Sequence, residues 1–546
     1  MADNENNILA EISNLVINFY TYQGIVQAIE GVDLIIRKGE TLGLVGETGC
    51  GKSVTASAIM KLILTPPGKI EGGHVYFMEP PDVRARRVQF EADAQRWYQG
   101  LPVGERKKLV ATYGFRWTGF VRRPKPVTKA VVEKTVPPER APPRLVDQYL
   151  ATKLPSIPKG DKVSLDAIKR SYDLLSKSIR YMQKIRGRFI SMIFQEPTSA
   201  LNPVFTAGDQ IAEVILQHRK TEIAGRVLKR INKEIELVKS NDRPRKLPTS
   251  HTLEMPADKR TVLKNPSRRV TYECSICHGE VSKDDDWCET CGVAFHGDLA
   301  WRIRPLFLQS YRRLLIAVQK NPDSRNPILS KIPIINRYRA ELYDEAFREA
   351  IRMLEVVRIP DPKGVAIRYP YELSGGMQQR VMIAIALACN PKLLIADEPT
   401  TALDVTIQGQ ILKLMRDLKQ TYGSSILLIT HNLGVVAEMC DRVGVMYAGS
   451  MAEVGVSRDI FKRPLHPYTQ GLMKAVPSIQ MESERLYTIR GSVPNLIYPP
   501  SGCRFHPRCD YAKKYCENVR PDMIEIEPGH EVSCHMVAKA EGYVRE

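Results

Sequence analysis

No stretch of the 546-residue sequence approaches the roughly 18 uninterrupted apolar residues that a transmembrane helix needs. The first residues, MADNENNILAEI, also lack the basic and then apolar layout of a secretory signal peptide. Apolar residues make up 43% of the chain and charged residues 26%, which is typical of globular proteins with several domains. We therefore expect a chain that works in the cytoplasm and does not itself span a membrane.

Acidic residues are in deficit, with 61 Asp and Glu against 79 Lys and Arg and a formal net charge of +18. Most of the basic excess lies in two blocks, residues 81–180 and 211–340. Such blocks suit anionic partners such as nucleic acid or lipid headgroups. They are equally well explained as two solvated basic segments, so charge alone leaves both interpretations open.

Cysteine is sparse outside two clusters, each of which holds four of the 11 cysteines. Clustered cysteines in a reducing compartment hold metal more often than they form disulfides. The first cluster has the spacing C-x2-C-x10-C-x2-C and consists of Cys274, Cys277, Cys288 and Cys291. Two such pairs can close a tetrahedron of thiolates, so we predict a zinc-ribbon-like module over residues 272–296. A rubredoxin-like iron and chance spacing are the alternatives, and His278 and His296 are expected to be bystanders.

The segment TLGLVGETGCGKS, residues 41–53, is an apolar run followed by the pattern G-x-x-x-x-G-K-[ST]. The next residues, VTASAIMKLIL, are typical of a helix. A strand, a glycine loop and a helix in this order predict a P-loop, whose N–H groups and helix N-terminus bind phosphates. Lys52 is expected to reach the β- and γ-phosphates and Ser53 to bind Mg²⁺. The loop residues predicted to bind ATP are Gly46, Thr48, Gly49, Cys50, Gly51, Lys52, Ser53 and Val54.

Two further apolar runs end in polar residues suited to catalysis. KLLIADEP leads to Asp397 and Glu398, and SSILLITHN leads to His431. The carboxyl ends of parallel strands meet at the edge of the sheet where ligands bind. We predict that Asp397 holds Mg²⁺ and that Glu398 polarises the attacking water. His431 is placed to hydrogen-bond the transferred group, although a lone histidine at a strand end is usually structural.

LSGGMQ precedes an apolar helix and predicts a second anion-binding surface, because its serine and glycines stand at the helix start. GETGCGKS, FQEP, LSGGMQ, LLIADEP, ALD and THN occur in an order that resembles ABC-type ATPase domains. The resemblance implies an α/β fold with a parallel core sheet, an antiparallel β subdomain and a helical signature subdomain. It also implies that the signature motif of one subunit closes on ATP held by its partner. The signature residues predicted to touch ATP are Ser374, Gly375, Gly376 and Gln378.

The same resemblance assigns roles to four more residues. Gln195 in FQEP is the residue that senses Mg²⁺ and water and couples to the membrane subunit. Asp404 belongs to the D-loop, and His431 is the switch histidine. An aromatic residue stacks on adenine, for which Tyr22 is the candidate and Tyr20 the alternative.

The C-terminal part contains FKRPLHPYTQGLMKAVPS, residues 461–478. With FQEPTSALNPVFTAGDQIAE, residues 194–213, it resembles the ATPase subunits of oligopeptide and dipeptide ABC importers. The implied function is ATP hydrolysis that drives the import of peptides or similar solutes, with nickel chelates and oligosaccharides also open. The implied partners are two membrane permeases, a second related ATPase subunit and an extracytoplasmic solute-binding protein. The implied location is the cytoplasmic face of the cell membrane.

The second cysteine cluster follows C-x5-C-x6-C-x17-C and consists of Cys503, Cys509, Cys516 and Cys534. It lacks a C-x-x-C knuckle and is a poor match to a zinc ribbon. Four thiolates from an irregular loop suit a [4Fe–4S] cluster, which the importer resemblance also implies. Zinc and no metal are the alternatives, and His506 or His535 could replace a ligand.

The motifs are separated by two insertions that do not resemble the family. In the first, residues 122–160 are rich in proline and predict an extended arm, and residues 164–185 predict an amphipathic helix. The predicted domains are an ATPase core (1–80), a basic insertion (81–180), a Q-loop segment (181–217), a basic insertion with the zinc module (218–343), a catalytic part (344–460) and the C-terminal region (461–546).

The sequence is also compatible with a second function, action on nucleic acid or ribosomes. Some ABC-type ATPases act on nucleic acid or ribosomes without membrane partners, and basic insertions with a zinc module fit nucleic-acid binding. The single ATPase domain and the HPYT-containing C-terminal region favour the importer instead, so nucleic acid is not the expected partner.

Overall fold

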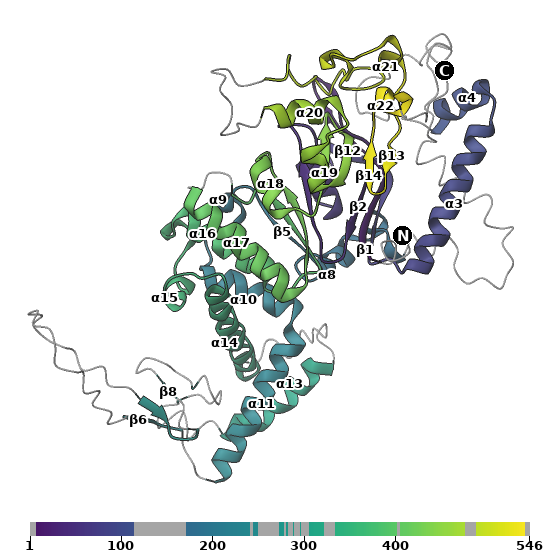
Figure 1. Cartoon of the computed structure of the whole chain (residues 1–546). Helices are drawn as coiled ribbons and strands as arrows, with labels where there is room; N and C mark the ends of the chain where they lie inside the picture. The colour runs from purple at the N-terminus through teal and green to yellow at the C-terminus, as the bar shows by residue number, and fades with distance from the viewer. Residues whose placement is uncertain are drawn as a thin grey trace, which may run out of the picture. The chain divides into compact units, whose positions relative to one another are not determined.

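The computed structural model describes residues 7–113, 171–240, 244–248, 272–277, 280–281, 288, 295, 305–320, 333–400, 405–475 and 488–540. The chain divides into two compact units (Figure 1). Unit 1 comprises Met1–Leu201 and Ser374–Glu546, and unit 2 comprises Asn202–Leu373.

Unit 1 contains an eight-stranded sheet with the order β13-β14-β12-β11-β3-β10-β9-β5. The five adjacent strands from β11 to β5 run parallel to one another, and the other pairs in the sheet are antiparallel. The strands are β3 (Thr41–Val45), β5 (Ile190–Ile193), β9 (Leu393–Asp397), β10 (Ser425–Ile429), β11 (Arg442–Tyr447), β12 (Ser450–Val456), β13 (Ile524–Glu527) and β14 (His530–Val532). Every residue of the five parallel strands is buried, as expected for a parallel sheet covered on both faces. The strands predicted to lead into the P-loop, Asp397 and His431 are thereby confirmed.

A second sheet of unit 1 is antiparallel and has the order β2-β1-β4. Its strands are β1 (Ile8–Thr21), β2 (Gly24–Arg37) and β4 (Gly68–Phe77). Their apolar side chains join β3, β5, β9 and β10 in one hydrophobic core. Because that core continues into the parallel sheet, the two sheets support each other around the P-loop helix.

The helices of unit 1 lie between and after these strands in the chain, and most are labelled in Figure 1. They are α2 (Lys52–Ile59), α3 (Pro81–Gly100), α4 (Val103–Tyr113), α8 (Ile179–Ile185), α9 (Pro197–Ala200), α16 (Gly375–Leu387), α17 (Val405–Tyr422), α18 (Leu433–Met439), α19 (Ser457–Lys462), α20 (Pro467–Lys474), α21 (Lys514–Asn518) and α22 (His535–Ala540). Short 3-10 turns lie at Leu174–Ser176 and His506–Arg508.

The amphipathic helix predicted for residues 164–185 is broken in its described part, residues 171–185, although Ile179–Ile185 is helical. The chain leaves the helix at Asp173, forms a 3-10 turn, and begins α8 only after Ser178. The Asp173 carboxylate accepts hydrogen bonds from the backbone N–H groups of Val75 (3.1 Å) and Leu175 (3.0 Å). It also contacts the ring of His74 at 2.9 Å. These bonds tie the segment to β4, which apolar periodicity could not indicate. The predicted arm over residues 122–160 lies outside the described residues.

Unit 2 is helical with a small sheet. Its helices are α10 (Ala207–His218), α11 (Lys220–Lys239), α13 (Pro305–Lys320), α14 (Pro333–Val356) and α15 (Pro362–Ala366), with a 3-10 turn at Pro370–Glu372. The pairs α11–α13 and α10–α14 pack together, and Arg230 of α11 bonds Glu341 and Glu345 of α14. The sheet has the order β6-β7-β8, from Lys246–Pro248, Tyr272–Cys274 and Glu280–Val281. No helix in the described ranges of either unit is long and apolar enough to cross a membrane.

Candidate functional site

The glycine loop between β3 and α2 has a backbone that only glycine fits at two positions. Gly46 has φ 152°, and a Cβ there would lie 2.1 Å from the Met446 carbonyl oxygen. Gly51 has φ 103°, and its Cβ would lie 2.7 Å from Ile29 Cδ1. The loop can therefore turn tightly beside the neighbouring strands and enter α2 at Lys52.

Lys52 and Ser53 occupy the start of α2, where the helix dipole is positive. The buried Lys52 Nζ donates hydrogen bonds to the carbonyl oxygens of Gly46 (2.8 Å) and Glu47 (3.1 Å). The exposed Ser53 lies 344 positions from Asp397, yet its Oγ is 3.0 Å from Asp397 Oδ1. Burial raises the pKa of Asp397, although the hydrogen bond from Ser53 lowers it. Two of the three residues predicted to bind Mg²⁺, Ser53 and Asp397, thus lie side by side, and a hydroxyl with a carboxylate suits that hard cation. The third is Gln195.

The carboxylate of Glu398 contacts two of the other three predicted catalytic side chains, those of Gln195 and His431, whereas Lys52 lies at the start of α2. Its Oε2 accepts a hydrogen bond from Gln195 Nε2 at 3.0 Å, and its Oε1 lies 3.1 Å from His431 Nδ1. The three residues follow the adjacent strands β5, β9 and β10, so parallel pairing brings them to one edge. Glu398 itself has φ 47°, a conformation uncommon outside glycine and typical of functional sites.

The signature motif begins α16, and Ser374 is its N-cap. The Ser374 Oγ accepts a hydrogen bond from Met377 N at 3.4 Å, and both Ser374 and Gly375 are exposed. Gly376 is partly buried, whereas Gln378 is buried. The helix start therefore presents its serine and first glycine to solvent, where a ligand can reach them.

The remaining predicted nucleotide contacts differ in exposure. Tyr22, in the turn between β1 and β2, is fully exposed, whereas the Tyr20 hydroxyl donates to Glu71 Oε1 at 2.6 Å. Tyr22 therefore has the freer ring for stacking. Of the loop, Thr48 and Gly49 are exposed, Val54 is partly buried and Cys50 is buried. Asp404 lies outside the described residues.

The first cysteine cluster has the spacing of a metal site. The sulfur atoms of Cys274, Cys277 and Cys288 all lie within 4.8 Å of one another, and those of Cys277 and Cys288 are 3.4 Å apart. Thiolates at about 2.3 Å from a tetrahedral zinc ion lie about 3.8 Å from each other, so these residues fit zinc. With Val281 they also form a small core. Cys291, His278 and His296 lie outside the described residues.

The second cysteine cluster is more open. The backbone N–H of Cys503 donates to the Cys516 carbonyl oxygen at 2.8 Å. Burial, together with the neighbouring Cys534, Cys516 and Cys509, raises the pKa of Cys503 to about 11. Across the described chain, the first cluster alone brings three cysteine ligand atoms within 4.8 Å of one another. No three sulfur atoms of the second cluster meet that distance.

The C-terminal region also touches the phosphate loop, which sequence reasoning missed. The backbone N–H of Glu47 donates to the Tyr468 hydroxyl at 2.9 Å. Arg508 donates to both oxygens of the Glu47 carboxylate, at 2.7 Å and 3.1 Å. Tyr468 belongs to the HPYT motif, a family signature to which the sequence assigns no role, and no sequence signal marks Arg508.

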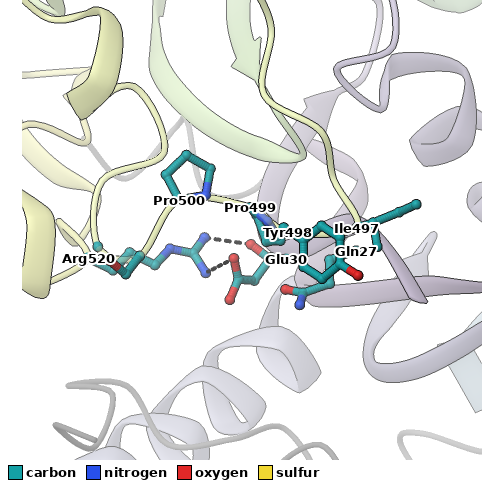
Figure 2. A pocket seen from close by; sticks show the side chains of 9 residues that line it. Gln27, Glu30, Ile497, Tyr498, Pro499, Pro500 and Arg520 are labelled. Carbon is teal, nitrogen blue, oxygen red and sulfur yellow. Dashed lines mark hydrogen bonds and ion pairs between the residues drawn. The ribbon is translucent and has the colours of Figure 1, made fainter. Parts of the chain in front are cut away.

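A cavity of about 480 Å³ lies between β2 and the C-terminal segment of unit 1 (Figure 2). Figure 2 shows Arg520 pointing toward Glu30 at its wall, where Arg520 Nη2 donates to the Glu30 carbonyl oxygen at 2.5 Å. The lining residues include none of those predicted from the sequence. The cavity is therefore separate from the catalytic cluster around Glu398.

Comparison with known proteins gives two family matches. Residues 29–111 and 300–401 match the model of the ABC transporter family, and residues 452–516 match that of the oligopeptide/dipeptide transporter C-terminal region. The oligopeptide transport ATP-binding protein AppD of Bacillus subtilis is 31% identical over 528 residues, which cover 97% of this chain and 96% of that protein. The dipeptide transport ATP-binding protein DppD of the same organism is 29% identical over 523 residues, covering 96% and 93%. The oligopeptide transport ATP-binding protein OppD of Escherichia coli is 52% identical over 190 residues, 35% of this chain and 56% of that protein.

Proposed function

The chain belongs to the ATP-binding subunits of oligopeptide and dipeptide ABC transporters, and from this premise we propose that ATP hydrolysis at the Glu398 cluster drives peptide import. It is an ATPase with the P-loop fold of that family. The catalytic site is assigned from one observation: the side chains of Gln195 and His431 both contact the carboxylate of Glu398. Action on nucleic acid, the alternative from the sequence, finds no support among these relatives, whose names all describe transport.

The roles of the side chains follow from charge and position. Lys52 would neutralise the β- and γ-phosphates, and Ser53 with Asp397 would hold Mg²⁺, which screens the charge that develops on the phosphates. Glu398 would orient the attacking water and accept its proton. His431 and Gln195 hold the two oxygens of Glu398 and thereby fix the direction of that carboxylate.

The exposed signature residues give the chain a second role. Ser374, Gly375 and Gly376 stand at the start of α16, and Asp404 lies next to α17 in sequence. A second ATPase subunit, related to this one, would present its own P-loop to this helix start. ATP would then be held between two subunits, and hydrolysis would release them.

Unit 2 has a surface that suits a permease partner. Val204, Phe205, Ile367 and Tyr371 are exposed by 48–73%. The backbone bond from Ala207 N to the Arg368 carbonyl oxygen, 2.9 Å long, joins the two segments that carry them. We assign this patch to a cytoplasmic helix of a membrane permease, because large exposed apolar side chains mark interaction sites. The subunit would then work on the cytoplasmic face of the membrane, with a solute-binding protein on the other side.

Reconstitution tests this function. The chain, two permeases and a second ATPase subunit would be placed in liposomes with a peptide-binding protein and labelled peptide. We expect ATP consumption that rises when the binding protein is loaded, together with peptide accumulation in the lumen. Lys52→Ala should abolish both, because it removes the phosphate-binding ammonium group. A complete complex that neither consumes ATP nor moves peptide would contradict the proposal.

Two metal modules complete the proposal. Cys274, Cys277, Cys288 and Cys291 would hold one structural zinc ion, which would stabilise a module too small to bury a large core. Cys503, Cys509, Cys516 and Cys534 would hold a [4Fe–4S] cluster with a structural role, since phosphoryl transfer requires no redox step.

Metal analysis of Cys288→Ser checks the first module. Cys288 is fully buried against Cys274 and Val281, so a serine oxygen there removes one thiolate from the interior of the site. We expect about one zinc ion per wild-type chain and its loss from the variant, measured by plasma mass spectrometry after dialysis. Cys389→Ser, at a half-buried cysteine outside both clusters, should keep the metal. A wild-type chain without zinc, in which Cys288→Ser removes about one iron and Cys389→Ser removes none, would identify the rubredoxin-like alternative.

A further inference from the structure

Glu47, the second residue of the phosphate loop, uses all three of its polar groups in bonds. Its carbonyl oxygen accepts from Lys52 Nζ at 3.1 Å, within the loop. Its backbone N–H and its carboxylate instead bond Tyr468 and Arg508 of the C-terminal region. The loop residue that contacts the catalytic lysine is therefore held from outside the loop.

Arg508 is itself fixed before it reaches Glu47. It ends the 3-10 turn His506–Arg508, between Cys503 and Cys509, and its side chain is only 6% exposed. Its Nε donates to the Arg490 carbonyl oxygen at 2.8 Å, and its Nη1 donates to the Tyr447 hydroxyl at 3.2 Å. A guanidinium held in this way meets a carboxylate with two parallel bonds, the strongest and most directional geometry for such a pair.

We propose that Arg508 is a positioning residue for nucleotide binding, which presets the phosphate loop through Glu47. The proposal rests on the proposed function in one respect, namely that this loop binds the phosphates of ATP. A loop held in its binding conformation pays less ordering entropy when the ligand arrives. Arg508 also neutralises the Glu47 carboxylate, which would otherwise repel phosphate oxygens. Both effects act on affinity, whereas the catalytic cluster around Glu398 is left unchanged.

The test measures affinity and turnover separately in the full-length protein. A fluorescent ATP analogue reports the Kd of the purified chain, and the reconstituted transporter gives KM and kcat. We expect Arg508→Ala to raise Kd and KM about tenfold and to change kcat less than about twofold. The Kd of Arg508→Lys should fall between those of the wild type and Arg508→Ala, because lysine keeps the charge but cannot make both hydrogen bonds to the Glu47 carboxylate.

Arg520→Ala is the matched control. Arg520 is another C-terminal arginine that bonds a glutamate of unit 1, but its partner is Glu30 of β2 at the cavity wall (Figure 2). Its loss should leave the nucleotide Kd unchanged. The thermal midpoint of each variant, measured without nucleotide, shows whether a change in Kd reflects general unfolding, and Arg508→Lys provides a test if the alanine variant does not fold.

Coupling to Glu47 distinguishes positioning from a merely structural role. In a Glu47→Gln background, the Glu47 charge and the paired hydrogen bonds from Arg508 are already lost. Adding Arg508→Ala should therefore raise Kd by less than a further factor of about two. Additive effects of the two substitutions, or wild-type Kd in both Arg508 variants, would overturn the inference. A wild-type chain that binds no nucleotide at all would refute the proposed function instead.

Discussion

Replacing Glu398 with glutamine is expected to reduce ATP turnover by at least about 100-fold while ATP binding persists. Glutamine has nearly the same shape, but its amide cannot accept the proton of the attacking water. The substitution also disturbs the bonds to Gln195 and His431, since one carboxylate oxygen becomes a donor. Phosphate groups would still meet Lys52 and Ser53, so the variant should trap bound ATP.

The measurement compares turnover and binding in the same preparations. Phosphate release by the reconstituted complex gives the rate, and the fluorescent ATP analogue gives the affinity. Glu438→Gln is a suitable control, because Glu438 is an exposed residue paired with Arg416 at 2.9 Å. Glu438→Gln should keep the wild-type rate of phosphate release and the wild-type affinity for the ATP analogue. Unchanged turnover in Glu398→Gln would remove Glu398 from the role of general base.

The catalytic edge could be predicted from sequence because its residues directly follow buried strands. Short apolar runs before Gly46, Asp397 and His431 are strong strand signals, and parallel strands end at one edge. The structure accordingly brings Ser53 to Asp397 across 344 positions, and Gln195 and His431 to Glu398. The ABC-type ATPase fold expected from the motifs is confirmed, whereas the domain boundaries remain predictions.

Contacts between distant polar side chains could not be predicted in the same way. Arg508 and Glu47 are 461 positions apart, and neither stands in a periodic pattern. The break at Asp173 has a similar origin, since it depends on the Val75 N–H and the His74 ring of β4 and not on local composition. Hydrophobic periodicity reports which face of an element is buried, but it contains no information about which charged groups meet there.

Arg87 gives the second large expected effect, on stability. It lies on α3, a helix with few apolar buried residues, and its side chain is 0% exposed. Its guanidinium bonds Glu79 at 2.9 Å, Glu11 at 2.8 Å and Glu91 at 3.1 Å. Its Cζ lies 3.8 Å from the centre of the Tyr76 ring. Arg87 thus pairs with three carboxylates where α3 meets β1 and β4, and one of them, Glu11, also pairs with Arg84 at 2.6 Å.

Arg87→Met is expected to lower the free energy of local opening of α3 by about 3–5 kcal/mol, because it leaves the buried Glu79 carboxylate without its cation. Amide hydrogen exchange over Pro81–Gly100 should accelerate by roughly 100-fold or more. Arg96→Met, on the same helix, is the control. Arg96 pairs with Asp93 but is 74% exposed, so its loss should cost less than about 1 kcal/mol.

The loss of α3 stability in Arg87→Met should also depend on pH in a defined direction. Burial already raises the pKa of Glu79, although the Arg87 hydrogen bonds lower it, so without Arg87 the folded-state pKa rises further above its unfolded value. The folded variant then binds more protons than the unfolded one, and its stability falls as pH rises above the unfolded pKa. Adding Glu79→Gln to Arg87→Met should recover part of the protection of α3 against amide hydrogen exchange and weaken this pH dependence. Equal exchange rates in Arg87→Met and wild type across that pH range would show that α3 is held by its apolar contacts and not by these charges.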